Sequence, residues 1–303
     1  LYIMMNLDQL KHSTKDKLKF RLSEAVIYTS DSGYTYSKYL DSPSANGPTD
    51  ESYTELTNEQ LQRQKEYIES NLESNKQKFK NQISVVKEFI NSGNLLDVGC
   101  GGGAFISLAQ DENFRCEGIE LNINRANFAK NKTGAVIHQE DICSDEFIFK
   151  HSKNFDVISL WDVIEHVNYP CATLDSIYKC QKPGGWLFID TPAKDSFYHK
   201  FGELTYKLSG GRLPTFLDLM YSDTPFGHKQ IFSTSELKKI VEESGYEVHL
   251  IRKFHELSFP YKHYLGKVSN NKYFLNIFDV LVTLAFRLLQ IQNKFVVAAK
   301  KPN

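Results

Sequence analysis

The chain has 303 residues, of which 41% are hydrophobic and 24% charged, and its formal net charge is -1 at pH 7. This composition is typical of a globular protein with one large domain or two small ones, and the near-zero charge argues against a non-specific nucleic-acid binder. Five scattered cysteines without a C-x-x-C pair favour reduced thiols in a cytoplasmic protein. We see no signal-peptide pattern at the start, and no apolar run reaches the roughly 18 residues of a membrane span.

The N-terminal quarter differs in character from the rest of the chain. Residues 1–57 are rich in Ser, Gly, Pro and Asp, which favour turns. We therefore predict an irregular arm, with a cap of tyrosine rings over a ligand as the alternative. A helix is predicted over 58–91, where apolar residues reach helical spacing only in the second half. Residues 1–75 are accordingly expected to form an N-terminal arm and cap helix.

From residue 95 apolar strands alternate with helical segments. Strands are predicted at 95–99, 116–121, 135–141, 155–161, 185–192, 246–254 and 293–301. Such alternation implies parallel pairing with right-handed crossovers, so residues 76–303 are predicted to form one doubly wound, Rossmann-like α/β domain.

Two segments interrupt this alternation. Residues 193–232 are too long for a routine connection and are predicted to form a lid. Residues 255–292 contain an inserted amphipathic helix at about 273–291, whose apolar face is expected to cover the sheet or a second copy of the chain. A membrane-surface helix is the alternative, although its weakly charged polar face does not favour that interpretation.

A glycine-rich loop, LLDVGCGGGAF, lies where the first of these strands passes into a helix. Gly99, Gly101 and Gly103 allow a tight turn and a close approach to a ligand at the helix N-terminus. Glu120 ends the next strand, where an acid can accept hydrogen bonds from both ribose hydroxyls of a nucleoside. The same spacing fits the dinucleotide pattern G-x-G-x-x-G/A, so an NAD-dependent dehydrogenase stays a competing interpretation.

Three further features favour a different nucleoside cofactor. Asp97 lies inside the glycine strand, where dinucleotide-binding strands are usually apolar, and it suits a ligand that carries an ammonium group. Asp141, at the end of the third strand, can accept a hydrogen bond from an adenine amino group. A long helix also precedes the glycine strand, instead of that strand opening the domain.

Six motifs in order then carry a resemblance: LLDVGCGGGAF, GIEL, QEDI, FDVISLWDVIEHV, KPGGWLFIDTP and GHKQIFSTSELKKIVEESGYEV. The chain resembles class I S-adenosylmethionine-dependent methyltransferases over roughly 76–253 and the last strand. The nearest branch includes ubiquinone-biosynthesis O-methyltransferases and sugar or polysaccharide methyltransferases. The resemblance implies a seven-stranded sheet with an antiparallel last strand. It also implies that S-adenosylmethionine is held by Asp97, Gly99, Gly101, Gly103, Glu120, Leu121, Asp141, Ile142, Leu160 and Trp161.

The stretch DVIEHV follows the fourth strand, at the sheet edge where open α/β folds bind ligands. Asp162, Glu165 and His166 share one face if a helical turn starts at Asp162. His166 is then a general base, a ligand of a divalent cation together with the two acids, or a structural residue. His228, at the end of the lid, is the second candidate base. We assign His166 and His228 as the catalytic candidates and assign no metal ligand.

The expected activity is O-methylation of a sugar, glycan or related small molecule, with a nucleotide-linked or lipid-linked acceptor and no nucleic acid. A quinone or phenol O-methyltransferase is the alternative within the class. A dehydrogenase and a non-catalytic cofactor-binding regulator are the alternatives outside it. A homodimer and a peripheral contact with a membrane are also compatible with the inserted apolar helix.

Overall fold

The structure is a computed structural model. It describes residues 16–23, 25–30, 33–37, 59, 62–63, 65–66, 68–70, 75–218, 220–221, 228–256, 275–277, 279–281, 284 and 291–303.

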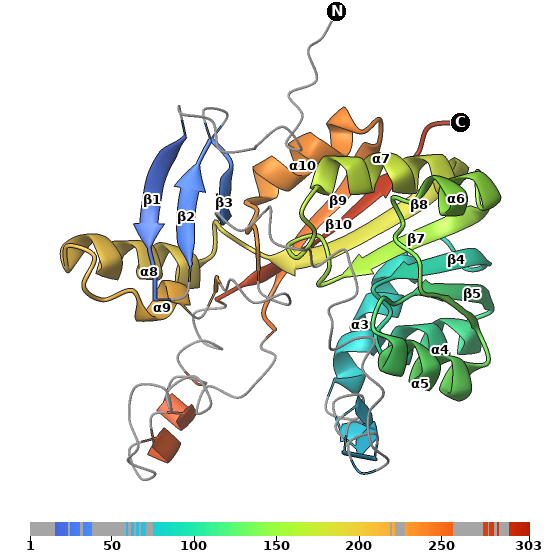
Figure 1. The fold of residues 1–303 in the computed structure, drawn as a ribbon, viewed down its shortest axis with the longest axis horizontal. Helices are drawn as coiled ribbons and strands as arrows, with labels where there is room; N and C mark the ends of the chain where they lie inside the picture. The colour runs from blue at the N-terminus through green and yellow to red at the C-terminus, as the bar shows by residue number, and fades with distance from the viewer. Residues whose placement is uncertain are drawn as a thin grey trace, which may run out of the picture.

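A seven-stranded sheet forms the centre of the molecule (Figure 1). Its strands run in the order β6-β5-β4-β7-β8-β10-β9, with the first five parallel and β10 antiparallel to both β8 and β9. The predicted doubly wound sheet with an antiparallel last strand is therefore confirmed. The strands are β4 (Gly93–Val98), β5 (Phe114–Ile119), β6 (Val136–His138), β7 (Phe155–Trp161), β8 (Gln181–Pro192), β9 (Glu247–Phe254) and β10 (Lys294–Lys300).

Helices cover both faces of this sheet, which explains why its strands are apolar on both sides (Figure 1). One core includes buried side chains of α3, α4 and α5, and the other includes those of α6, α7 and α10. The helices are α3 (Lys76–Lys87), α4 (Ala104–Asp111), α5 (Ile123–Thr133), α6 (Asp145–Lys150), α7 (Pro170–Cys180) and α10 (Thr234–Glu243). Ser233 and Glu236 form the capping box that starts α10.

The prediction of an irregular arm is wrong for the described residues between 17 and 37. They form an antiparallel sheet of β1 (Lys17–Arg21), β2 (Val26–Thr29) and β3 (Thr35–Ser37). This sheet packs against α8 (Phe197–Leu208) and α9 (Thr215–Asp218), which lie in the segment predicted as a lid. We call β1–β3, α8 and α9 the lid unit.

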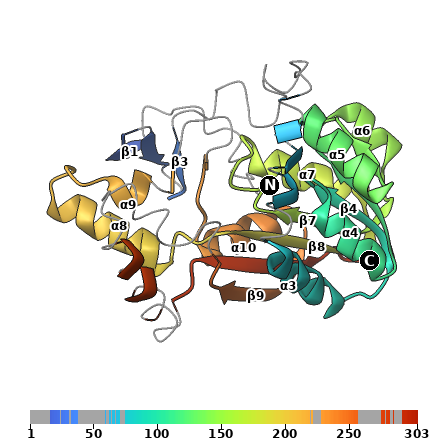
Figure 2. The ribbon, with the colours of Figure 1, turned by 90° about the horizontal axis from the view of Figure 1, so that it is seen from below.

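A separate small core explains why these strands form. It contains Phe20, Ala25, Ile27, Leu217, Tyr221 and Ile231, so residues from two distant segments of the chain share it. A bridge between Tyr36 and Gln230 continues this contact toward the main domain. Figure 2 shows the lid unit to the left, beyond the end of the central sheet. The strands depend on a partner far away in the sequence, which the local pattern does not reveal.

The two remaining helical predictions also change in detail. The predicted helix 58–91 does not run unbroken to 91, because α3 begins at Lys76 after a turn at Asn75 and ends at Lys87. In the insertion, the described residues between 275 and 284 are helical, and Ile277, Leu281 and Leu284 are exposed. These side chains do not cover the sheet, and the contact with a second copy of the chain, the other predicted option, stays a prediction. Within the described residues, no helix is both long and apolar enough to cross a membrane.

Candidate active site

The glycine loop joins β4 to α4, and Gly99, Gly101 and Gly103 all have positive φ angles. A Cβ on Gly99 would lie 2.6 Å from Cγ2 of Val163, in the loop after β7. A Cβ on Gly101, in contrast, would meet no atom of the residues that the structure describes within 4 Å. Gly99 is therefore required by a close approach within the protein, whereas Gly101 faces open space suited to a ligand.

Glu120 follows β5 and fastens this loop. One of its carboxylate oxygens accepts a hydrogen bond from the Gly101 amide at 2.9 Å, and the other accepts one from the Asn122 amide at 2.8 Å. Burial raises the pKa of Glu120, and the backbone donors oppose that shift. Each oxygen keeps a second lone pair, so the held carboxylate fits the ribose hydroxyls of a nucleoside. Leu121, the next residue, is half-buried.

Asp97 is buried in β4, where it is 3% exposed. The Ser159 hydroxyl donates a hydrogen bond of 2.7 Å to its carboxylate. Burial raises the pKa of Asp97 to about 7, and the charges that act on it, from Asp190 and Glu120, are both acidic. A buried acid in such surroundings gains stability from a cationic group, so it fits the ammonium of an amino-acid ligand.

The predicted adenine side lies after β6. The Asp141 carboxylate accepts a hydrogen bond from the Cys143 amide at 2.9 Å, which fixes its direction, and Ile142 is buried beside it. Leu160 is fully buried in the sheet core, so its side chain does not face a ligand. Trp161 packs edge-on against Phe105, with ring centroids 5.1 Å apart.

The predicted grouping of Asp162 with Glu165 and His166 is wrong. Asp162 has a φ of 55°, so no helical turn starts there. Its carboxylate forms ion pairs with Lys78 and with Lys294, the latter at 2.6 Å. Although burial alone would raise the pKa of Asp162, the two ammonium groups hold it well below its usual range. Asp162 therefore joins α3 and β10 to the end of β7.

His228, and not Asp162, groups with Glu165 and His166. Glu165, His166 and His228 each offer a ligand atom, and these atoms lie within 4.8 Å of one another. The two imidazole rings are 4.9 Å apart between centroids. The amides of Lys229 and Gln230 donate to the Glu165 carbonyl at 2.8 and 3.2 Å, which brings the end of the lid segment to the loop after β7. We call these three residues the acid–histidine cluster.

The electrostatics of this cluster differ from residue to residue. Burial, followed by the charge of Asp162, raises the pKa of Glu165 to about 8, and the Thr191 hydroxyl donates to its carboxylate at 3.0 Å. Burial and the neighbouring His166 lower the pKa of His228. Nδ1 of His228 lies 2.7 Å from the Met220 carbonyl, which can only accept, so Nδ1 carries the hydrogen. The neutral ring therefore presents the lone pair of Nε2.

This arrangement supports two kinds of chemistry. A neutral, oriented imidazole can accept a proton from a hydroxyl group. The same Glu-His-His set could instead hold a divalent cation, because all three residues are ordinary metal ligands. Both candidate histidines were predicted from the sequence, but not that they meet.

The sequence did not reveal the acids and lysines beside this region. Asp190 in β8 is fully buried, accepts a 3.0 Å hydrogen bond from Gln82 and lies 3.6 Å from Lys294. Asp190, Gln82 and Trp161 line a cavity of about 520 Å³ between α3 and strands β8–β10. Asp190 could have been singled out from the sequence, because it is an acid within the otherwise apolar strand GWLFIDTP.

The sheet order, the glycine loop and the acid after the next strand define a nucleoside-binding methyltransferase fold. Residues 60–251 match a family of methyltransferase domains, which is more than half of the chain. The chain therefore belongs to the class I S-adenosylmethionine-dependent methyltransferases, as the motifs predicted. This family favours methyl transfer over the dehydrogenase alternative.

Two solved structures share the fold. An S-adenosylmethionine-dependent methyltransferase from Archaeoglobus fulgidus is 20% identical with a TM-score of 0.50, over 75% of this chain and 94% of that one. A methyltransferase described as putative from Bacillus halodurans is 15% identical with a TM-score of 0.50, over 74% of this chain and 98% of that one.

The curated relatives match shorter stretches. The ubiquinone biosynthesis O-methyltransferase of Paraburkholderia phytofirmans is 28% identical over 100 residues, 32% of this chain and 43% of that protein. The enzyme of the same name from Thiobacillus denitrificans is 25% identical over 156 residues, 50% of this chain and 64% of that protein. The chain thus spans less than two thirds of the length of these relatives.

Proposed function

We propose that this protein transfers a methyl group from S-adenosylmethionine to a hydroxyl oxygen of a small molecule, and that His228 accepts the hydroxyl proton. The observation that carries this proposal is the acid–histidine cluster, in which the Met220 carbonyl fixes the hydrogen on Nδ1 of His228. The lone pair of Nε2 is then available to a hydroxyl group.

S-adenosylmethionine supplies, when bound, a methyl group on a positively charged sulfur that leaves readily. Glu120 would hold the ribose, Asp97 would face the ammonium group and Asp141 would orient the adenine. Nε2 of His228 would accept the proton of the acceptor hydroxyl as the oxygen–carbon bond forms and the carbon–sulfur bond breaks. The products are the methyl ether, S-adenosylhomocysteine and a proton that His228 releases to solvent.

Glu165 would act on His228 as a positioning residue. An ionised Glu165 partly offsets the lowering of the His228 pKa, and His228 partly offsets the raising of the Glu165 pKa. When His228 gains a proton, the imidazolium favours the ionised form of Glu165, which then stabilises the charged ring. The buried position of Glu165 strengthens this effect, because few water molecules screen the two groups.

For the acceptor we propose a sugar or glycan hydroxyl, carried on a nucleotide or a lipid. The lid unit supports a sizeable acceptor, because it is a folded layer connected through Gln230 to the acid–histidine cluster. Its helix α8 also exposes apolar side chains suited to a carrier group, namely Phe197, Phe201, Leu204 and Leu208. A quinone or phenol is the second candidate, favoured by the similarity to ubiquinone biosynthesis O-methyltransferases.

Paired histidine variants test the base. We expect His228→Asn to lower kcat by about 10²- to 10⁴-fold while the Kd for S-adenosylhomocysteine stays unchanged, since a general base contributes about this much. The matched variant His166→Asn should lower kcat less. Wild-type kcat should rise with pH up to the lowered pKa of His228 and then level off, and His228→Asn should lose this limb. Wild-type turnover in His228→Asn would refute this assignment.

A panel of acceptors tests the substrate class. The purified protein is incubated with S-adenosylmethionine and either nucleotide sugars or catechols, and mass spectrometry locates the added methyl group. We expect methylation of a sugar hydroxyl. Methylation of catechols alone would establish the second candidate, and a methyl group on protein or nucleic acid would reject both.

A further inference from the structure

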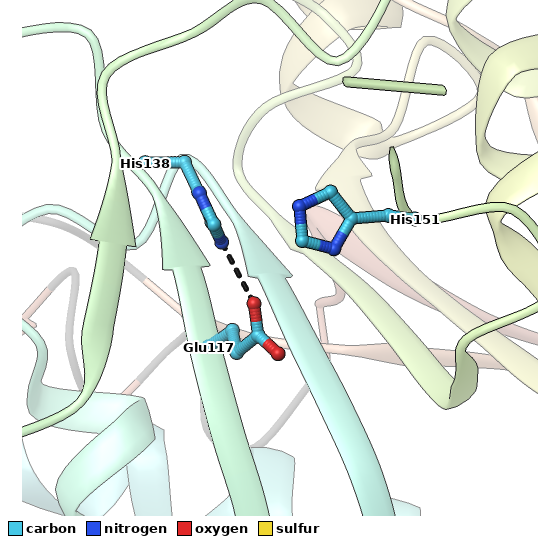
Figure 3. Close-up of side chains that lie close together, drawn as sticks. All are labelled: Glu117, His138 and His151. Carbon is cyan, nitrogen blue, oxygen red and sulfur yellow. Dashed lines mark hydrogen bonds and ion pairs between the residues drawn. The ribbon is translucent and has the colours of Figure 1, made fainter. Parts of the chain in front are cut away.

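A second group of metal-ligating side chains lies at the β6 edge of the central sheet, away from the lid unit. It consists of Glu117 in β5, His138 in β6 and His151, which ends α6 (Figure 3). Ile119 and His138 are register partners across the two parallel strands. No residue of this group belongs to the acid–histidine cluster or to the glycine loop.

The three side chains converge closely. Nε2 of His138 lies 2.7 Å from a carboxylate oxygen of Glu117, and the rings of His138 and His151 are 4.8 Å apart between centroids. One ligand atom from each residue lies within 4.8 Å of the other two. Figure 3 shows the His151 ring extending toward the His138–Glu117 pair. Tetrahedral zinc ligands lie about 3.3 Å apart, so binding of an ion would require the three side chains to adjust from these separations.

The surroundings hold the two histidines in place. His138 is 8% exposed and His151 6% exposed, and the His151 ring stacks on Phe147 with centroids 4.3 Å apart. Phe155 stacks on the His151 ring as well. Rigid, packed ligands lose little conformational freedom when a metal binds, which favours a site of this kind.

One polar atom in this group lacks a partner. Nε2 of His151 is buried, and it forms no hydrogen bond with any of the residues that the structure describes. A buried nitrogen without a hydrogen-bond partner lowers the stability of the folded protein. Coordination of a cation by a ring nitrogen of His151 would offset this loss. Burial, followed by the charge of the neighbouring His138, lowers the pKa of His151.

The charges around the group also permit a cation. Glu117 and Glu140 contribute negative charge near the histidines, and Lys150 contributes one positive charge. The side chain of Lys150 is exposed. Solvent therefore screens this positive charge, and the long side chain can turn away.

We propose that Glu117, His138 and His151 form a binding site for a divalent transition metal, with zinc as the best match. Two imidazoles and one carboxylate are a common zinc ligand set, with a water molecule at the fourth position. The ion would join the short edge strand β6 to β5 and to the end of α6. Because β5 and β6 lead into Glu120 and Asp141, it would also stiffen the strands that carry the proposed ribose and adenine contacts.

Zinc titration of the metal-free protein tests this proposal by calorimetry and thermal unfolding. We use Glu117→Gln, which alters a partly exposed side chain, and His151→Gln. His228→Asn is the matched control, because it removes a ligand from the acid–histidine cluster instead. Wild type and His228→Asn should both bind zinc at this site and unfold at a higher temperature with zinc.

Both Gln variants should lose one bound zinc or bind it at least about tenfold more weakly, and zinc should no longer raise their unfolding temperature. Cobalt in place of zinc should give the visible absorption of a four-coordinate ion in wild type and His228→Asn, but not in His151→Gln. The proposal is overturned if wild type binds no zinc, or if both Gln variants bind zinc as wild type does. It is equally overturned if the loss occurs in His228→Asn alone.

Discussion

The open space at Gly101 gives a sharp prediction for cofactor binding. Gly101 has a φ of 54°, and within the described part of the chain a Cβ added there meets no atom within 4 Å. In Gly101→Ala the folded protein therefore suffers only the backbone strain of an alanine in the left-handed region, about 1 kcal/mol. If the cofactor occupies the open space, the same methyl group encroaches on it. We expect the Kd for S-adenosylhomocysteine to rise at least tenfold, which is about 1.4 kcal/mol.

Gly134 provides a matched control. It ends α5 with a φ of 68°, and a Cβ there also meets no atom of any described residue within 4 Å. Gly134→Ala should lower the free energy of unfolding by a similar amount and leave the Kd unchanged. Chemical denaturation measures the first quantity and calorimetry the second. Equal Kd values for Gly101→Ala and wild type, or an equal loss of affinity in both variants, would refute the assignment of this space to the cofactor.

Three further predictions concern charge and packing. The pKa of Asp97 is about 7, above its unfolded value near 3.8, so deprotonation should lower the stability of the free protein progressively as pH rises from about 4 to 7. The affinity for S-adenosylhomocysteine should rise with pH through 7, because the ionised carboxylate attracts the ammonium group. Asp97→Asn should abolish that rise in a calorimetric pH series. Lys294→Met removes the cation beside the buried Asp190 and the half-buried Asp162, and it should lower the free energy of unfolding by about 3–5 kcal/mol. Lys253→Met at a partly exposed pair should cost less than about 1 kcal/mol, and equal losses in denaturation would contradict this. Leu217→Ala opens a cavity in the core of the lid unit and should lower the stability of that unit by about 2–5 kcal/mol. Proteolysis should then increase within 16–37, while the affinity for the cofactor is retained. A loss of that affinity would argue against a separate lid core.

The central sheet could be predicted because its strands are buried on both faces. Runs such as FDVISLW stay apolar throughout, and the helices between them fix parallel pairing, so β7 was predicted with its observed bounds. The start of β8 was missed, because KPGG is typical of a turn. The strand in fact begins at Gln181 and accommodates Gly184 at a φ of 74°.

The lid unit could not be predicted in the same way. Strands β1–β3 are three to five residues long, and their core is completed by Leu217, Tyr221 and Ile231. Short strands have little stability without such a partner, and no local pattern identifies one so distant. The sequence therefore predicted turns where the structure has a sheet.

The same distinction between local patterns and long-range contacts applies to the candidate site. The positions of the loop glycines and of Glu120 at the ends of their strands could be predicted from their spacing in the sequence. Contacts across the chain were not: Asp162 meets Lys78 and Lys294 instead of His166. Charge partners from three separate elements decide that outcome, and the pairing of the two candidate histidines depends on the same kind of long-range contact.

Titration of the wild-type protein with S-adenosylhomocysteine and, separately, with NAD tests the central claim most directly. The glycine loop, Glu120, Asp97 and Asp141 together predict one calorimetric site for S-adenosylhomocysteine and no saturable binding of NAD. Saturable binding of NAD without binding of S-adenosylhomocysteine would contradict the account of the loop and of its buried acids.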